Sequence, residues 1–233
     1  MTSPAVSITS LRHAWPGAEP TLDIERFEVA AGESVFLVGP SGSGKSTLLG
    51  LIAGVTPVQS GRIEVLGEPM LAGKPRQRDA IRASRLGVIF QMFNLVPFLN
   101  AVENVLLPLQ FSPERRQRLE AMDRDGPAEA RRLLRELRLD EASLTKKATD
   151  LSVGQQQRVA AARALIGGPG LVIADEPTSA LDRSARDSFI ALLMQECSTR
   201  GTALLFVSHD ETLAAHFDRK VDLGEINRAG VTA

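Results

Sequence analysis

The sequence predicts an α/β fold with a mostly parallel central sheet, and three short apolar segments carry that prediction. They run apolar without alternation, as strands do when both faces of a parallel sheet are covered. The three segments are residues 35–38, 171–174 and 204–207. Each is followed by a polar stretch that can begin a helix, and this order of elements is typical of doubly wound sheets.

Two other regions differ in pattern from these strands. Residues 22–29 alternate apolar and polar, which predicts a half-exposed strand near the amino terminus. Between about residues 95 and 165 helical spacing takes over, with a leucine stripe near residues 133–137 and Pro127 where a helix could begin. We interpret 95–165 as a helical insertion within a single domain that spans residues 1–233.

Composition narrows the class of protein. A length of 233 residues suits one large α/β domain, and contents of 43% hydrophobic and 24% charged residues are ordinary for a globular protein. With 27 basic and 28 acidic residues, nothing in the bulk charge suggests a nucleic-acid partner. Cys197 is the single cysteine, which excludes an internal disulfide. We see neither a bilayer-spanning run nor a signal peptide, so we expect a cytoplasmic protein unless a partner holds it at a membrane.

A glycine-rich loop directly follows the first buried segment. It fits the pattern of glycine, four residues, glycine, lysine, serine or threonine, in which backbone amides turn inward toward phosphate oxygens. Lys45 supplies a charge for the β- and γ-phosphates and Ser46 a hydroxyl for Mg²⁺, so the loop predicts binding of ATP with Mg²⁺. The candidate ATP-binding residues here are Gly39, Pro40, Ser41, Gly42, Ser43, Gly44, Lys45, Ser46 and Thr47.

Two acids end the second buried segment, at the edge where such sheets bind ligands. We expect Asp175 to hold Mg²⁺ through water and Glu176 to orient or deprotonate an attacking water. Taken alone, an Asp-Glu pair after a strand is a weak signal, because it equally fits a solvated strand end. The phosphate-binding loop makes the functional interpretation the stronger one.

A second anion site is predicted where a helix begins at residue 152. Ser152 is a good amino-terminal cap, and Gly154 leaves backbone amides open. Together with the loop and the acid pair, this stretch resembles the ATP-binding-cassette family, whose signature reads Leu-Ser-Gly-Gly-Gln. The matching residues are Ser152, Val153, Gly154 and Gln155, with Val153 in place of the first glycine.

The resemblance implies a P-loop NTPase core, an amino-terminal antiparallel β-subdomain and an inserted α-helical subdomain. It also implies roles for three further residues. Gln91 resembles the glutamine that contacts Mg²⁺ and the transmembrane partner, and Asp182, in the loop 179–182, resembles a residue that contacts the other subunit. His209 resembles the switch histidine that reads the γ-phosphate, whereas His13 and His216 match no motif.

An aromatic ring stacks on adenine near the start of such domains. The chain has no tyrosine, so Trp15 is the candidate for this role. The alternative is that Trp15 caps the edge of the amino-terminal sheet.

The region around residues 87–109 resembles one branch of the family. That branch comprises the lipoprotein-releasing, macrolide-exporting and cell-division cassettes of bacteria, whose permeases have few transmembrane helices and a large extracytoplasmic domain. An apolar cluster lies beside Gln91 and is either a docking surface for a permease helix or part of the helical core. Its members are Phe93, Leu95, Val96, Phe98 and Leu99.

A dimer is expected from the charge balance of the reaction as well as from the resemblance. Lys45 and Mg²⁺ hold one side of a triphosphate, yet no arginine is evidently placed to complete the site in the same chain. Ser152 of a facing chain could complete it. We therefore expect a head-to-tail homodimer, held by its permease at the cytoplasmic face of the bacterial inner membrane. Two alternatives stay open: a regulator of an extracytoplasmic enzyme that acts through a permease, and a soluble cassette ATPase.

Overall fold

The computed structural model describes residues 3–71, 73–179 and 181–229, and it contains two sheets. The first is antiparallel and four-stranded, in the order β2-β1-β4-β5. Its strands are β1 (Val6–Ala14), β2 (Pro20–Val29), β4 (Ser60–Val65) and β5 (Glu68–Pro69). Residues 22–29 lie in β2, where Leu22, Ile24, Phe27 and Val29 are buried and the acids between them are not.

The second sheet is five-stranded, in the order β6-β7-β8-β3-β9, and its neighbouring strands are parallel. Its strands are β3 (Ser34–Val38), β6 (Leu86–Ile89), β7 (Leu171–Asp175), β8 (Ala203–Val207) and β9 (Arg219–Asp222). The three apolar segments of the sequence form β3, β7 and β8, which are the interior strands. The predicted fold class is confirmed.

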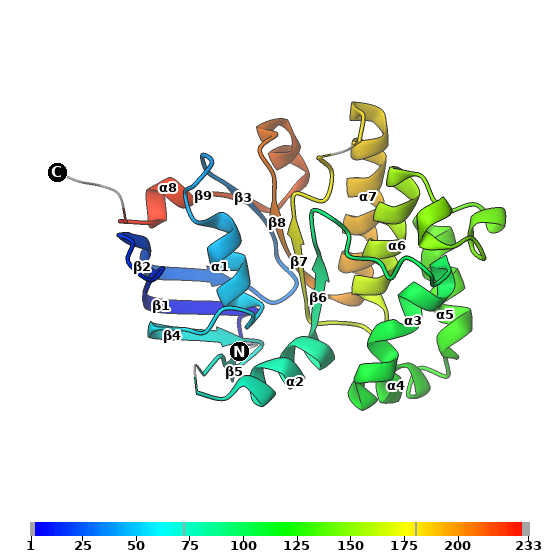
Figure 1. Ribbon diagram of the computed structural model, residues 1–233, viewed down its shortest axis with the longest axis horizontal. Helices are drawn as coiled ribbons and strands as arrows, with labels where there is room; N and C mark the ends of the chain where they lie inside the picture. The colour runs from blue at the N-terminus through cyan, green and yellow to red at the C-terminus, as the bar shows by residue number, and fades with distance from the viewer. Residues whose placement is uncertain (1–2, 72, 180, 230–233) are drawn as a thin grey trace.

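Helices cover the parallel sheet on both sides (Figure 1). Helix α1 lies between the two sheets, while α3, α5, α6 and α7 gather on the opposite side of the parallel sheet. The helices are α1 (Lys45–Ile52), α2 (Pro75–Arg85), α3 (Ala101–Phe111), α4 (Pro113–Glu120), α5 (Gly126–Glu136), α6 (Val153–Leu165), α7 (Arg183–Arg200) and α8 (Leu223–Ile226). Short 3-10 turns lie at Glu141–Ser143, Ala148–Asp150 and Glu211–His216. Within the described ranges, none of these helices is both long and apolar enough to cross a membrane.

The parallel sheet separates two hydrophobic cores, because successive residues of a strand point to opposite faces. Phe36 of β3 and Phe206 of β8 stack at 6.0 Å in the core that α6 and α7 cover. Their neighbours Val35, Leu37 and Leu205 belong to the core shared with α1 and the antiparallel sheet. This division keeps α1 and α6 apart, with the parallel sheet between them.

Candidate active site

Three functional segments meet at one edge of the parallel sheet. The register pairs Leu37 of β3 and Asp175 of β7 with the same residue, Val207 of β8. The glycine-rich loop, the acid pair and the segment that carries His209 therefore leave the sheet side by side, as the carboxyl ends of parallel strands do.

The phosphate-binding loop folds around its own lysine. Lys45 is the first residue of α1, and its ammonium donates hydrogen bonds to the carbonyl oxygens of Gly39 (2.7 Å) and Pro40 (2.9 Å). Gly44 needs to be glycine, because its φ is 100° and a Cβ there would lie 2.7 Å from the Leu22 side chain. No side chain caps α1, so its first amides face the loop interior, where a phosphate would be bound. Ser46 and Thr47 follow in the same turn.

Asp175 and Ser46 form an oxygen-rich pair beside this loop. Burial raises the pKa of Asp175, an effect partly offset by the Ser46 hydrogen bond and by the charge of Lys45. A carboxylate desolvated in this way favours a nearby cation, and carboxylate and hydroxyl oxygens are ligands that Mg²⁺ prefers. Gln91 comes two residues after β6, which pairs with β7, so its backbone lies at the same sheet edge. Among the described residues its side chain is exposed and hydrogen-bonds to neither Ser46 nor Asp175.

Glu176 and His209 touch each other at the end of β7. The Nε2 of His209 is in hydrogen-bond contact with the Glu176 carboxylate. Glu176 has a left-handed backbone with φ of 45°, and its amide donates to Val207 O at 3.0 Å. A left-handed residue other than glycine is uncommon and is often found where a side chain is aimed at a reaction centre. Both side chains can therefore face a phosphate held by the loop.

Trp15 lies at the end of the hairpin nearest the loop. It directly follows β1, and its side chain is 49% exposed. Asn227 connects the start of β2 to the loop, since its amide donates to Thr21 O (3.0 Å) and Ser43 O (3.2 Å). The ring is thus accessible at the end of the hairpin whose second strand Asn227 connects to the phosphate-binding loop.

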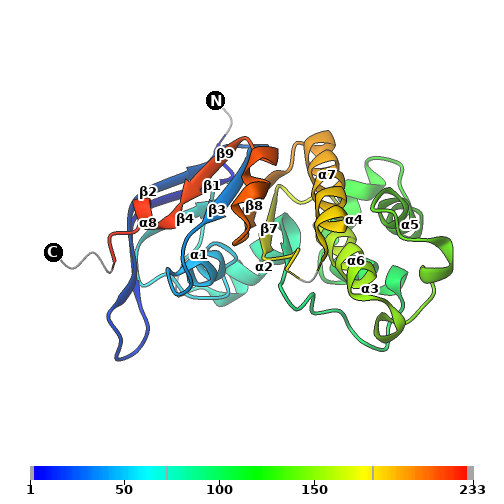
Figure 2. The same ribbon diagram turned by 90° about the horizontal axis from the view of Figure 1, so that it is seen from above.

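The second predicted anion site begins α6. Ser152 and Gln155 form a capping box, in which the Ser152 hydroxyl accepts from the Gln155 amide at 3.3 Å and Gln155 Oε1 accepts from the Ser152 amide at 2.9 Å. Val153 is half exposed, and Gly154 lies against Leu181. Both views place α1 and α6 apart, with the parallel sheet between them (Figures 1 and 2). A single protein chain therefore does not place its own phosphate-binding loop and its own signature against the same triphosphate.

The loop 179–182 leads into α7, and Asp182 caps that helix by accepting from the Ala185 amide at 2.9 Å. Ala180, in the same loop, lies outside the described residues. The Asp182 cap fixes the end of this loop. Leu181 of the same loop lies against the signature residue Gly154.

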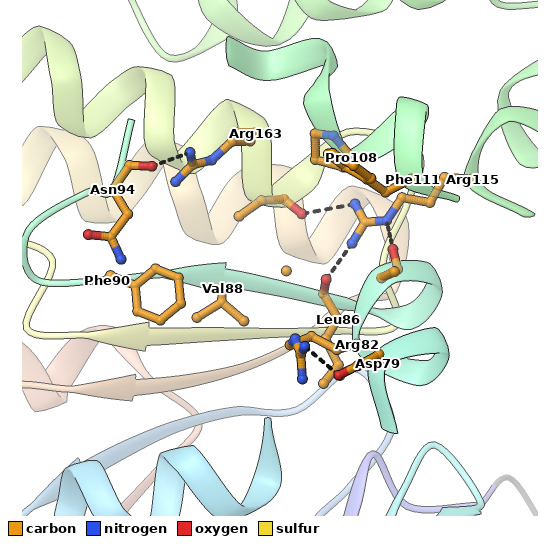
Figure 3. Close-up of a pocket in the computed structure, with 13 residues that line it drawn as sticks. Asp79, Arg82, Leu86, Val88, Phe90, Asn94, Pro108, Phe111, Arg115 and Arg163 are labelled. Atoms are coloured by element: carbon orange, nitrogen blue, oxygen red, sulfur yellow. Dashed lines mark hydrogen bonds and ion pairs between the residues drawn. The ribbon is translucent and has the colours of Figure 1, made fainter. Parts of the chain in front are cut away.

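A cavity of about 580 Å³ opens beside Gln91, between α2, β6, α3, α4 and α6 (Figure 3). Its lining combines Phe90 and Phe111 with the guanidinium groups of Arg82, Arg115 and Arg163. The structure divides the apolar cluster of this region. Phe93 is buried in the helical core and Leu95 packs against it, whereas the side chain of Phe98 is 71% exposed. Phe93 and Leu95 are therefore core residues, and Phe98 is surface.

Two residues of the site have no signal in the sequence. Asn227 holds the phosphate-binding loop from 184 residues away. Arg163 of α6 donates to Asn94 O (2.7 Å) and Phe93 O (2.5 Å), and so holds the loop that follows Gln91 (Figure 3). Such tertiary hydrogen bonds leave no periodicity or local motif from which they could be found.

Comparison with known proteins decides the family. The family model described as ABC transporter matches residues 22–179, which is more than half of the chain. The chain belongs to the ABC transporter family. This confirms the resemblance drawn from the signature and makes the chain an ATP-binding ATPase, since the family hydrolyses ATP.

Individual relatives cover most of the chain. An uncharacterized ABC transporter ATP-binding protein of Escherichia coli (strain K12), YbbA, is 44% identical over 82% of this chain and 80% of its own length. The lipoprotein-releasing system ATP-binding protein LolD of Anaeromyxobacter dehalogenans is 40% identical over 96% and 92%. Among solved structures, the ABC cassette MJ0796 in a dimeric, post-hydrolysis state with ADP and Pi superposes with a TM-score of 0.80 at 31% identity, over 93% of each chain.

Proposed function

We propose that this ABC ATPase works as a head-to-tail homodimer that drives a membrane permease with few transmembrane helices and a large extracytoplasmic domain. The permease holds the dimer at the cytoplasmic face of the bacterial inner membrane. Two ATP molecules lie between the two chains, each between the phosphate-binding loop of one chain and the signature of the other. Closing of this sandwich pulls on the permease, and hydrolysis releases it.

The observation that carries the proposal is the separation of two anion-binding helix ends within one chain. Helix α1 starts without a side-chain cap and helix α6 starts with the capping box of Ser152, and the parallel sheet lies between the two helices. A second chain turned head to tail can place its Ser152 over the phosphates held by Lys45. The dimeric description of the MJ0796 structures is consistent with this arrangement.

Within each composite site we assign the following roles. The loop residues 39–47 bind the phosphates and Trp15 stacks on adenine. Ser46, Asp175 and Gln91 would hold Mg²⁺, which neutralises phosphate charge when bound. Glu176 orients and deprotonates the attacking water, while His209, already in contact with Glu176, reads the γ-phosphate.

The permease docks, in this proposal, at the cavity beside Gln91. Two of its lining residues, Phe90 (38%) and Phe111 (73%), are exposed, and Met92 (81%) and Phe98 (71%) are exposed along the segment that follows Gln91. Exposed apolar side chains gathered at a concave site are typical of a surface that another protein covers. The names of the LolD relatives, which belong to lipoprotein-releasing systems, support a permease partner of that branch.

Mixing two inactive variants tests the composite site. Lys45→Ala removes the loop charge and Ser152→Arg blocks the signature, so each variant alone has two damaged sites per dimer. A mixed dimer has one site with both intact elements and one with both lesions. We expect phosphate release to reappear when one variant is titrated into the other.

The matched control titrates Lys45→Ala into a second preparation of the same variant, where no intact site can form. If loop and signature served the same chain's nucleotide, every site in the first mixture would carry one lesion. A flat response in both titrations would then count against the head-to-tail dimer.

A further inference from the structure

His13 is a buried histidine that belongs to none of the motifs. It lies on β1, opposite Leu22 of β2, and its side chain is 3% exposed. Among the described residues neither of its ring nitrogens has a hydrogen-bond partner. Its ring meets that of Trp15 at a centroid distance of 5.1 Å and an interplanar angle of 85°. One buried, unpaired imidazole thus contacts the candidate base-stacking ring.

The backbone on both sides of Trp15 is already fixed. The side chain of Gln59 holds Ala14 through two hydrogen bonds, both 2.9 Å long, to its amide and its carbonyl. Residues 15–18 form a turn closed by the Ala18 amide on Trp15 O at 3.0 Å, with Pro16 second and Gly17 third at φ of 74°. This arrangement is that of a type II turn. The freedom that remains to Trp15 is rotation about its two side-chain bonds.

We propose that His13 is a positioning residue for the base of a purine nucleotide, because its ring holds the indole of Trp15 upright for stacking. The proposal rests on the proposed role of Trp15 in binding adenine. A perpendicular contact occupies at most one face of the indole, so the opposite face stays open to a purine. Without the imidazole, an indole that is half exposed can turn about its side-chain bonds and lie over the sheet.

The contact between the rings of His13 and Trp15 sets the expected change in nucleotide affinity. A perpendicular aromatic pair contributes an amount that corresponds to about two- to tenfold in a binding constant. A ring that is ordered before binding does not lose that freedom on binding, which favours the complex in the same direction. The effect should reach only ligands that carry a base.

The simpler role for His13 is to fill buried space beside the antiparallel sheet. A filler is replaced by an apolar side chain of similar volume without consequence for the nucleotide. The two roles are separated by variants that keep the volume but differ in the ring. His13→Leu keeps apolar volume without a ring, and His13→Phe keeps a ring that can still meet the indole edge to face.

The experiment measures binding of Mg-ADP, which carries the base and is not hydrolysed, and of inorganic pyrophosphate, which has no base. In the full chain, His13→Leu should weaken ADP about two- to tenfold and leave pyrophosphate unchanged, while His13→Phe should restore ADP affinity. Trp15 is the single tryptophan of the chain, so its fluorescence anisotropy reports the ring directly. His13→Leu should lower that anisotropy, and His216→Leu, at an exposed histidine, should not.

A double-variant cycle with Trp15→Ala completes the test. In the Trp15→Ala background, His13→Leu should have no further effect on ADP. Unchanged ADP affinity in His13→Leu, equal losses for ADP and pyrophosphate, or a loss that persists without Trp15 would each overturn the positioning role. If the His13→Leu variant does not fold, His13→Val, whose side chain suits a strand, tests the same loss of the ring in the same binding measurements.

The same binding measurements distinguish failure of the proposed stacking by Trp15 from failure of the positioning role of His13. If Trp15→Ala alone leaves ADP affinity unchanged, then Trp15 does not stack on the base and the role of His13 falls with it. If Trp15→Ala weakens ADP but His13→Leu does not, the stacking stands and the positioning role alone is wrong.

Discussion

Glu176 is held from two directions at the end of its strand. Its amide is bound to Val207 O at 3.0 Å, and its carboxylate is in contact with His209. The left-handed backbone turns the side chain away from the direction that the strand alternation would give it. The residue thereby lies at the sheet edge from which the phosphate-binding loop also leaves its strand, as the proposed role of general base requires.

Replacing this carboxylate tests the assignment. Glu176→Gln keeps shape and loses basicity, so we expect steady-state phosphate release to fall about 10²- to 10⁴-fold while ATP binding persists and an ATP-bound dimer accumulates. Phosphate release and the dimer fraction with ATP are the two measurements. Glu120→Gln, at an exposed position of α4, is the matched control. Hydrolysis near the wild-type rate in Glu176→Gln would assign the base to another group.

At the scale of elements, an ion-pair network ties α5 to α7. Glu129 of α5 is buried and contacts Arg132 at 3.0 Å and Arg200 at 2.5 Å. Glu196 of α7 accepts from the same two arginines, at 3.0 and 3.3 Å. Burial raises the pKa of each glutamate, but the arginine hydrogen bonds and charges outweigh it, so both pKa values lie below the ordinary value.

The contribution of this network to stability depends on pH. A carboxyl whose pKa is depressed by folding stabilises the protein above its unfolded pKa, and this contribution is lost as pH falls through the folded pKa. Glu129→Gln should therefore lower the free energy of unfolding at pH 7 by about 2–4 kcal/mol, because two partly buried arginines lose a partner. The gap to the wild type should narrow as pH falls below about 4.5, the ordinary value for this carboxyl. Urea unfolding at several pH values measures both the loss of stability at pH 7 and its decrease at lower pH.

A surface pair provides the comparison for this prediction. Glu141 pairs with Arg135, and both side chains are largely exposed. Glu141→Gln should change stability little at any pH, since exposed pairs are screened by water. A Glu129→Gln variant that behaves like Glu141→Gln would show that the network holds α5 to α7 no more strongly than a surface pair does.

At the scale of the whole molecule, the exposed aromatic Phe98 tests the docking face. A charge at this position resists desolvation against an apolar partner, so Phe98→Asp should lower the fraction of protein recovered with washed membranes that contain the native permease. Val55→Asp is the matched control, because Val55 is also exposed but lies in the turn after α1. Equal recovery of the two variants would show that the docking face lies elsewhere on the protein. Thermal unfolding of both shows whether folding is intact.

Local pattern predicts most of the interior of this molecule. The strands β2, β3, β7 and β8 are recognisable because buried strands carry uninterrupted or alternating apolar residues. The phosphate-binding loop and the start of α6 are recognisable because their chemistry lies in consecutive residues. The edge strand β9 is not, since Arg219 and Lys220 are exposed in it and its pattern is not that of a buried strand.

What the sequence leaves undetermined depends on contacts between distant residues. Strand order places β3 between β8 and β9, and no local signal encodes it. The ring contact between His13 and Trp15 needs the observed rotamers, and the contact of His209 with Glu176 needs the left-handed turn at the end of β7. These features arise from the assembled fold.

The hydrogen bond from Asn227 to Ser43 O has a consequence for synthesis of the chain. The ribosome adds Asn227 184 residues after Ser43, which at common elongation rates is a delay of about 10–40 s. During that interval the growing chain already carries the glycine-rich loop but has neither the asparagine that holds it nor the strand β9 that flanks β3. The nascent protein therefore gains this support of the glycine-rich loop only once Asn227 has been added, well after the loop itself has been made.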